Sequence, residues 1–388
     1  METDIIIIGG GLVGGALAQG LALAGHKVVV VDSSPPPTHS TFDQRTLAIA
    51  AASRHLLDRL HIWENLSNNI TPIERITLSD TSPESLVVFD MQDQSQPEPL
   101  GYMLQHGNLR NAIYTTATQS QNITWIGQTK PIDFRLVPGG IELTLEHHKA
   151  PLKAKILIGA DGKKSWVRER SGIPSHRHSY TQTAVIALLK HPHVHRNVAV
   201  EHFTQEGPLA FLPMEGKTSG LVWSVSPSIL SLLMESTEQA ERLINTTFMD
   251  HRGPINLLTP LTTYPLEAVL PKRCISERIC LVGDAAHSMH PVAGQGLNVG
   301  FRDIECLLEH LSQARYLGLD LGAFTLLEAY EKKRRFDHLS MLAATDSIVR
   351  IFNIGVKPIP MIRRFSLQAL GFIPSIKKRM MRHAMGYS

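Results

Sequence analysis

A glycine-rich run near the N-terminus has the spacing of a nucleotide-binding turn. Residues 9–14 read Gly-Gly-Gly-Leu-Val-Gly and follow four consecutive isoleucines at 5–8. In this G-x-G-x-x-G pattern Gly9 permits the tight turn, and Gly11 lets the backbone approach a diphosphate. Gly14 allows the helix to pack closely on the strand, and the helix N-terminus attracts the anion. We expect the turn to bind a dinucleotide, the alternative being a glycine-rich turn in an ordinary β-α unit.

A compact β-α-β unit surrounds this turn. The runs at 5–8 and 27–32 indicate two buried parallel strands, because both are rich in β-branched residues. Between them, residues 12–24 are rich in alanine and leucine and stop at Gly25, which is typical of a helix C-terminus. Asp32 closes the second strand, where its carboxylate can accept hydrogen bonds from a ribose diol. The unit predicts the start of a doubly wound sheet.

A second turn carries a single carboxylate. Residues 155–158 indicate another buried strand, which runs into Gly-Ala-Asp-Gly at 159–162. Small residues leave room beside the end of the strand, and Asp161 is the acid among them. On the residues alone, Asp161 either faces a ligand or caps the helix that follows it.

The third motif follows a strand predicted at 278–282. That strand delivers Asp284 to a turn, where the carboxylate can bind hydroxyl groups of a ligand. The loop at 294–296 then opens the next helix, whose dipole stabilises negative charge near its N-terminus. His287 and His290 lie in the turn, and we interpret both as shaping it or making structural hydrogen bonds.

Together the three motifs resemble those of the class A FAD-dependent aromatic monooxygenases, and they span nearly the whole chain. The run HPVAGQGLNVGFRD at 290–303 is similar to the signature of the ubiquinone-biosynthesis hydroxylases, the UbiH/UbiI/UbiF group. Further segments similar to that group lie at 42–48, 100–110 and 201–213. Two positions differ: many flavoproteins of this type carry Glu in place of Asp32, and several ubiquinone hydroxylases carry Asn in place of Asp284.

The resemblance implies which residues bind the cofactor. The implied FAD-binding residues are Gly9, Gly11, Val13, Gly14, Asp32, Arg45, Arg110, Asp161, Gly162, Asp284, Gly294, Gly296, Leu297 and Asn298. The flavin side of the substrate pocket would be the loop that holds Pro291, Gly294, Gln295 and Gly296. We assign no side chain as acid or base and none as a metal ligand.

The resemblance also implies a reaction. NADPH or NADH binds transiently and reduces FAD, O₂ then gives a C4a-hydroperoxyflavin, and an electron-rich phenolic ring attacks its distal oxygen. The implied substrate is a polyprenylphenol intermediate of ubiquinone biosynthesis. Two alternatives stay open: a class A hydroxylase of a small soluble aromatic compound, and a flavin-binding scaffold subunit of a biosynthetic complex. A ubiquinone-biosynthesis complex is a further expected partner.

The middle of the chain has a different pattern. From about Ser179, short apolar runs separated by turn signals indicate antiparallel strands. We predict an α/β fold with a Rossmann-like FAD-binding domain, an interleaved antiparallel-sheet substrate domain and a helical C-terminal tail. The predicted FAD-binding domain comprises 1–74, 101–178 and 266–338, the substrate domain 75–100 and 179–265, and the tail 339–388. Helical spacing predicts helices at 47–60, 109–118, 307–317 and 323–338.

The composition is that of a globular protein with a sizeable core. The 388 residues are 43% hydrophobic and 19% charged, with a net charge of +3, which argues against disorder and against nucleic acid as a partner. Cys274, Cys280 and Cys306 lack zinc-site spacing and are interpreted as buried thiols of a reducing compartment. We expect a cytoplasmic protein, with peripheral contact at the inner face of the membrane as an alternative.

The C-terminal tail is basic and apolar. No acidic residue follows Asp346, whereas arginines and lysines alternate with apolar residues up to Arg382. Such a pattern is typical of a membrane-surface or partner-binding helix, which would help to reach a polyprenyl substrate. The alternative is a helix pair that packs on the flavin domain with a solvated basic face.

Overall fold

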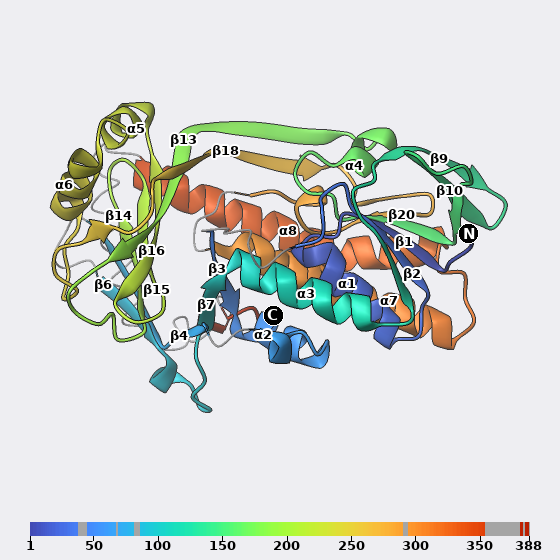
Figure 1. Ribbon diagram of the computed structural model, residues 1–388, viewed down its shortest axis with the longest axis horizontal. Coiled ribbons are helices and arrows are strands. Elements are labelled where there is room, and N and C mark those ends of the chain that lie inside the picture. Colours follow the sequence, from blue (N-terminus) through green and yellow to red (C-terminus); the bar gives the residue numbers. More distant parts are fainter. Residues whose placement is uncertain are drawn as a thin grey trace.

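The structure is a computed structural model, and it describes residues 1–37, 45–66, 69–80, 86–289, 294–353, 381–382 and 385–387. Two sheets of different character lie at opposite ends of the molecule, and two long strands, β13 and β18, run between them (Figure 1). This arrangement confirms the predicted α/β fold with a second, sheet-based part.

A six-stranded sheet forms the first body. Its strands, in order across the sheet, are β19 (Ile275–Ser276), β20 (Ile279–Leu281), β12 (Ile156–Gly159), β1 (Ile5–Ile8), β2 (Val28–Val31) and β8 (Ile123–Ile126). All neighbours are parallel except β19 and β20. The β-branched residues of β1 and β2 are buried on both faces, as expected for central strands of a parallel sheet.

Helices cover one face of this sheet and a small sheet covers the other. The helices are α1 (Leu12–Leu23), α3 (His106–Gln119), α7 (Gln295–Tyr316) and α8 (Phe324–Asn353). The opposite layer is formed by β9 (Pro131–Val137), β10 (Gly140–Leu145) and β11 (Leu152–Ala154). The side chains of β1 alternate between the two faces of the sheet: Ile5 and Ile7 pack toward the helices, and Ile6 and Ile8 toward the small sheet. The hydrophobic core is therefore divided into two layers.

The second body is built on an eight-stranded sheet. Its strands are β5 (Arg75–Asp80), β6 (Leu86–Asp90), β13 (Ser175–Lys190), β14 (Val198–Phe203), β15 (Pro208–Pro213), β16 (Thr218–Val225), β17 (Asn256–Leu257) and β18 (Thr262–Pro271). Neighbours are antiparallel except β5 and β14. The helices α5 (Pro227–Leu233) and α6 (Thr237–Thr247) pack on one face, so the other face is left to meet the first body.

The long strands β13 and β18 connect the two bodies (Figure 1). Their pairing shifts register between Ser179 and Thr183, which marks a bulge. The predicted domain boundaries at 178/179 and 265/266 fall inside these two strands. The passage between the bodies is therefore a continuous, hydrogen-bonded ribbon.

The helix predicted at 47–60 is wrong at 47–50. The chain forms β3 (Thr46–Ala50) before α2 (Ala51–Arg59), and β3 pairs with β7 (Gly101–Gln105), which also pairs with β4 (Thr71–Ile73). The spacing of the apolar residues in this segment fits both a helix and a strand, and pairing with the distant strand β7 favours the strand. Short helical turns complete the description: η1 (Trp63–Asn65), η2 (Met91–Asp93), α4 (Trp166–Arg170) and η3 (Gly283–Ala285).

The C-terminal part departs from the predicted boundaries. Helix α8 continues through the predicted boundary at 338/339 to Asn353. Most of the predicted tail beyond it lies outside the described residues. At the end of the chain, Met381 and Met385 are buried against Phe89 and Phe203, so the C-terminus returns to the body of the protein. No helix among the described residues combines the length and the apolar character needed to cross a membrane.

Candidate active site

Four candidate residues lie at one edge of the parallel sheet. Strands β20, β12, β1 and β2 are adjacent and parallel, so their carboxyl ends lie side by side. The residues that follow these ends are Asp284, Asp161, Gly9 and Asp32. The carboxyl edge of such a sheet is where doubly wound folds bind their ligands. The topology therefore gathers the three sequence motifs, which lie far apart in the chain.

The glycine turn between β1 and α1 is closely packed on one side and open on the other. Gly9 has a φ of 100°, and a Cβ atom there would overlap the carbonyl oxygen of Ala160. A Cβ on Gly14 would overlap the carbonyl oxygen of Gly9. By contrast, a Cβ on Gly11, which begins α1, would meet no heavy atom within 4 Å. The open space at Gly11 is where a diphosphate could approach the helix N-terminus.

Val13 connects the first motif with the third. A Cβ on Gly300 would lie 2.8 Å from Val13, and one on Gly283 would lie 3.1 Å from it. The side chain of Val13 thus occupies the space that these two glycines leave. Gly283 precedes Asp284, so this contact fixes the position of Asp284 relative to the glycine turn.

Asp32 is engaged by the backbone on both carboxylate oxygens. One accepts a hydrogen bond from the amide of Gly10 and the other from the amide of Ser34, each at 2.6 Å. Asp32 therefore holds the glycine turn in place. Its proposed contact with a ribose remains a prediction and would use the remaining lone pairs of the same oxygens.

The two carboxylate oxygens of Asp161 differ: one accepts a structural hydrogen bond and the other has no partner among the described residues. Its Oδ2 accepts a hydrogen bond from the amide of Val167 at 3.0 Å, which supports the helix-capping interpretation. Its Oδ1 is buried and has no partner among the described residues. Burial raises the pKa of Asp161, although the hydrogen bonds from Ser165 and Val167 oppose this effect. A buried acceptor without a donor fits the polar group of a ligand.

Arg168 fixes the second motif to the third. Its buried guanidinium donates to the carbonyl oxygen of Ala285 at 2.9 Å and to that of Lys163 at 2.7 Å. Ser165 begins α4 and accepts a hydrogen bond from the amide of Arg168 at 3.0 Å. The Asp161 turn and the Asp284 turn are therefore held together by hydrogen bonds.

Asp284 faces a cavity and has no hydrogen-bond partner among the described residues. The surrounding protein raises the pKa of its carboxyl group, and the charges of His287 and Lys163 partly oppose this. The carboxylate nevertheless remains exposed to the cavity. An acceptor in this position can bind hydroxyl groups, such as those of a ribityl chain.

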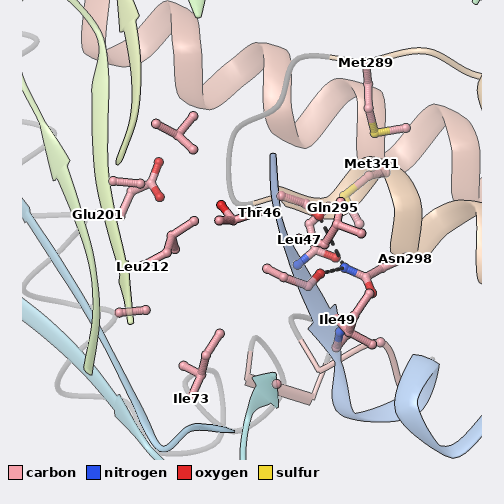
Figure 2. A pocket seen from close by; sticks show the side chains of 18 of the residues that line it. Thr46, Leu47, Ile49, Ile73, Glu201, Leu212, Met289, Gln295, Asn298 and Met341 are labelled. Atoms are coloured by element: carbon pink, nitrogen blue, oxygen red, sulfur yellow. Dashed lines mark hydrogen bonds between the residues drawn. The ribbon is translucent and has the colours of Figure 1, made fainter. Parts of the chain in front are cut away.

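The N-terminus of α7 borders the same cavity. Gly294 precedes the helix with a φ of 61°, and Gln295 is its first residue. The side chain of Asn298 donates to the carbonyl oxygen of Ala48 (Figure 2). It also accepts a hydrogen bond from the amide of Ala50. The helix start is thus fixed to strand β3. His290 and Pro291 lie outside the described residues.

The cavity has a volume of about 2140 Å³ and lies between the two bodies. Figure 2 shows Thr46, Gln295 and Asn298 on one side and Glu201 and Leu212 on the other. The wall contributed by the eight-stranded sheet is mostly apolar; it includes Ile76, Leu78, Ala184, Ile186, Ala199, Ala210, Leu212 and Val222. Among the cavity-lining residues of β5, β6 and β13 to β16, Glu201 alone is ionisable. The sequence motifs did not single it out as a site residue.

The predicted site residues fall into two groups. Those that line the cavity are Arg45, Asp284, Gly294, Gln295 and Asn298. Those that lie outside its lining are Gly9, Gly11, Val13, Gly14, Asp32, Arg110, Asp161, Gly162, Gly296 and Leu297. Arg110 donates to the carbonyl oxygen of Pro35 at 3.1 Å, and Arg45 lies 3.3 Å from His106. Which part of FAD each residue contacts stays a prediction.

A buried network behind the third motif was missed by the sequence reasoning. Asp303 accepts hydrogen bonds at 2.7 Å from each of His287, His338 and Arg334. His287 therefore makes a structural hydrogen bond, as interpreted from the sequence. His287, Asp303 and His338 are residue types that can bind a metal ion and lie close together, but the Arg334 guanidinium already compensates the charge of the carboxylate.

The residues at this edge fit FAD. The open space at Gly11 accommodates a diphosphate, the unpaired Oδ1 of Asp161 needs a donor, and Asp284 offers an acceptor at the cavity wall. FAD would then extend from the glycine turn to the α7 N-terminus, whose amides and dipole favour negative charge.

Comparisons with known proteins agree with this site. The family model of the FAD binding domain matches residues 2–337. The chain is 40% identical to the ubiquinone hydroxylase UbiL of Rhodospirillum rubrum, over 99% of this chain and 90% of the relative. It is 32% identical to the 3-demethoxyubiquinol 3-hydroxylase of Escherichia coli, over 99% of this chain and 98% of the relative.

A solved structure supports the same fold. The p-nitrophenol 4-monooxygenase PnpA of Pseudomonas putida is similar with a TM-score of 0.82 at 18% identity, over 100% of this chain and 99% of that one. Identity at this level shows the fold alone. With the family model and the closer relatives, the chain belongs to the FAD-binding-domain family of monooxygenases, in the group of the ubiquinone-biosynthesis hydroxylases.

Proposed function

We propose that the protein hydroxylates the aromatic ring of a polyprenylphenol intermediate of ubiquinone biosynthesis, with FAD, NAD(P)H and O₂. The observation that carries the proposal is the cavity, which has predicted cofactor residues on one wall and an apolar sheet on the other. Apolar walls stabilise a hydrocarbon chain and a ring by removing them from water. An aromatic ring held between the walls would face the α7 N-terminus while its tail follows the sheet.

The chain's own residues would position the reaction and exclude water. Bound FAD supplies the redox chemistry, which the side chains of the protein cannot perform. The bond between Asn298 and β3 fixes the helix N-terminus that borders the cavity. The dipole of α7 stabilises negative charge at that end. The apolar wall keeps water from the reacting ring.

The same wall argues against a small anionic substrate. A carboxylated aromatic compound needs a fixed cation, whereas the cavity-lining residues of β5, β6 and β13 to β16 include no arginine or lysine. The arginines and lysines that line the cavity come from other elements: Arg45, Lys163, Arg302, Lys333, Arg334 and Arg382. Lys163 is paired with Glu267 at 3.2 Å, Lys333 with Glu309 at 2.7 Å and Arg334 with Asp303 at 2.7 Å. A neutral phenol with an apolar tail suits this wall better.

Substrates of graded tail length test the proposal. Purified, FAD-loaded protein is given NADPH and phenols that share a ring but carry no prenyl unit, one, two or three. We expect hydroxylated product, measured by mass spectrometry, to rise with tail length. Ala210→Leu places a larger side chain on the apolar wall and narrows the cavity, so it should lower that product while FAD content stays normal. Efficient, coupled turnover of the tail-less phenol alone would contradict the proposal.

The proposal includes peripheral contact with the inner face of the membrane. Its support is the basic and apolar sequence beyond Asp346. Flotation with vesicles is the test: binding to vesicles with anionic lipids, weakened by salt, is expected. A protein that binds neither anionic nor neutral vesicles would contradict the proposed membrane contact.

A further inference from the structure

Glu201 projects into the cavity from the middle of the apolar wall. On β14, Val198 and Val200 pack in the core beneath α5 and α6, and the alternate residues point the other way. Ala199, Glu201 and Phe203 therefore share the face that lines the cavity. Figure 2 shows the Glu201 carboxylate directed from the sheet into the cavity, on the side opposite Thr46 and Gln295.

The surroundings of Glu201 give it no structural task. Its neighbours across the sheet are Leu78 on β5 and Ala210 on β15, and both are apolar. Its carboxylate has no hydrogen bond and no ion pair in the described part of the chain. Burial raises its pKa to about 7, and no charged neighbour contributes to the shift. An unpaired acid in an apolar wall costs stability, so its presence indicates contact with a ligand.

The other ionisable groups of the cavity belong to other elements. They are Arg45, His106, Lys163, Tyr264, Glu267, Asp284, Arg302, Glu305, Cys306, Glu309, Lys333, Arg334, Asp337, Arg382 and Tyr387. None of them shifts the pKa of Glu201. Tyr264 and Glu267 lie on β18 of the same sheet, and Glu267 pairs with Lys163 at 3.2 Å. Glu201 is therefore the carboxylate that this sheet presents to the cavity without an ion pair in the described part of the chain.

We propose that Glu201 is the catalytic residue that accepts the phenolic hydrogen bond, and then the phenolic proton, of the ring being hydroxylated. This inference rests on the proposed function. The phenolic O–H bond breaks, an O–H bond forms on the carboxylate, and the electron pair stays on the phenolate oxygen. A bond then forms between a carbon of the electron-rich ring and one oxygen atom of O₂ as the O–O bond breaks, and the hydrogen of that carbon leaves as a proton when the ring regains its aromaticity. The other oxygen atom leaves as water, and NAD(P)H is the reductant.

The position of Glu201 also fixes the orientation of the ring. The phenolic oxygen is held at the sheet side, so the carbons across from it or beside it turn toward the α7 N-terminus. The cavity-lining residues of the adjacent strands β5 and β15 are apolar, so their side chains offer a substrate hydroxyl no competing acceptor. Glu201 thereby determines which ring carbon is presented to the cofactor side.

A ligand-binding measurement tests the role of Glu201 separately from the proposed function, because binding requires no turnover. The probes are a prenylphenol and its O-methyl ether, and their binding to FAD-loaded protein is followed by the change in flavin absorbance. Above pH 7, wild type should bind the phenol about tenfold more tightly than the ether, which is the effect of one hydrogen bond to a charged acceptor. The preference should fall as the pH drops through 7 and Glu201 takes up a proton.

Three variants sharpen the test. Glu201→Gln should lose the pH dependence of the preference and release less hydroxylated product per NADPH, with unchanged FAD content. Glu201→Asp should keep the pH dependence with weaker preference, and it serves if the Gln variant does not fold. Glu215→Gln, in the exposed turn between β15 and β16, is the matched control and should behave as wild type. Infrared difference spectra should show a carboxylic C=O band that titrates near pH 7 and is missing in Glu201→Gln.

The outcomes are distinguishable. Equal pH-dependent preference in wild type and Glu201→Gln would overturn the role of Glu201, whatever the enzyme hydroxylates. Normal phenol preference with no prenylphenol turnover would instead count against the proposed function and leave the Glu201 contact in place.

Discussion

The side chain of Asn298 accepts a hydrogen bond from the backbone amide of Ala50 at 2.8 Å, although 248 residues separate the two in sequence. Asn298 also donates to the carbonyl oxygen of Ala48 at 2.9 Å. These bonds hold the first turn of α7 against β3, which borders the cavity. The position of the helix N-terminus relative to the substrate wall therefore depends on one buried amide side chain.

Loss of this amide should weaken FAD binding as well as the fold. Asn298→Ala leaves a buried donor and acceptor unpaired, which costs about 1–3 kcal/mol in the free energy of unfolding. We expect the dissociation constant of FAD, measured by fluorescence titration, to rise about tenfold or more, because the α7 N-terminus is no longer held.

A matched control exists in the other body. Asn245 makes comparable bonds to the backbone of Ile255, far from the cavity. Asn245→Ala should lose similar stability in urea unfolding while FAD affinity stays normal. Equal FAD affinity in both variants would show that Asn298 supports the fold alone.

Two glycines of the same turn should respond differently to alanine. Gly11→Ala places a methyl group in open space, so unfolding stability should stay within about 0.5 kcal/mol, or rise slightly by reduced freedom of the unfolded chain. The methyl group would nonetheless occupy the approach of the diphosphate. FAD content after purification should therefore fall sharply.

Gly14→Ala should damage the fold itself. Its methyl group would overlap the Gly9 carbonyl oxygen, so the strand and helix must move apart. We expect a loss of several kcal/mol in unfolding free energy, on the order of overpacked cores. A Gly11→Ala protein with full FAD content would contradict the placement of the diphosphate.

Asp303 should govern part of the acid sensitivity of the protein. Burial alone would raise its pKa, but the charges and hydrogen bonds of His338 and His287 outweigh this and hold the pKa well below its usual range. The stabilisation is thus complete above about pH 5 and is lost progressively as the pH falls below the unfolded value near 4.

The Asp303→Asn variant tests this assignment. The buried Arg334 would lose one of its two carboxylate partners and keep Asp337 at 2.6 Å, so we expect a loss of about 3 kcal/mol at pH 7, the low end for breaking a buried ion pair. Urea unfolding between pH 3 and 7 should show a flatter acid limb for the variant than for wild type. Parallel pH profiles of the two proteins would show that other carboxylates cause the acid sensitivity.

Local sequence signals predicted the β-α-β start well, because glycine spacing, β-branched runs and helix-ending glycine act over a few residues. The strand at 46–50 could not be predicted, since its partner β7 lies some fifty residues away and the pairing overrides local periodicity. The three motifs allowed FAD to be predicted as the cofactor, because each motif is a run of consecutive residues in the sequence.

The substrate side is different. Glu201 begins the segment 201–213 that resembles the ubiquinone hydroxylases, but that resemblance gives it no role. Its lack of a partner depends on what surrounds it: Leu78 and Ala210 come from separate strands. Likewise, the network around Asp303 joins residues from the turn after η3, from α7 and from α8, which only the fold brings together. Burial and unpaired polarity are properties of the tertiary structure, and a single sequence does not contain them.

Mass spectrometry of quinone intermediates tests the central claim most directly. The gene is deleted and complemented with wild type, with Asp284→Ala or with the exposed control Glu215→Gln. The account predicts that one under-hydroxylated prenylphenol accumulates in the deletion strain and disappears with wild type and with Glu215→Gln. Asp284→Ala, which lacks the acceptor at the cavity wall, should not restore hydroxylation. Normal ubiquinone in a deletion strain that has no redundant hydroxylase would contradict the account and point to another aromatic substrate.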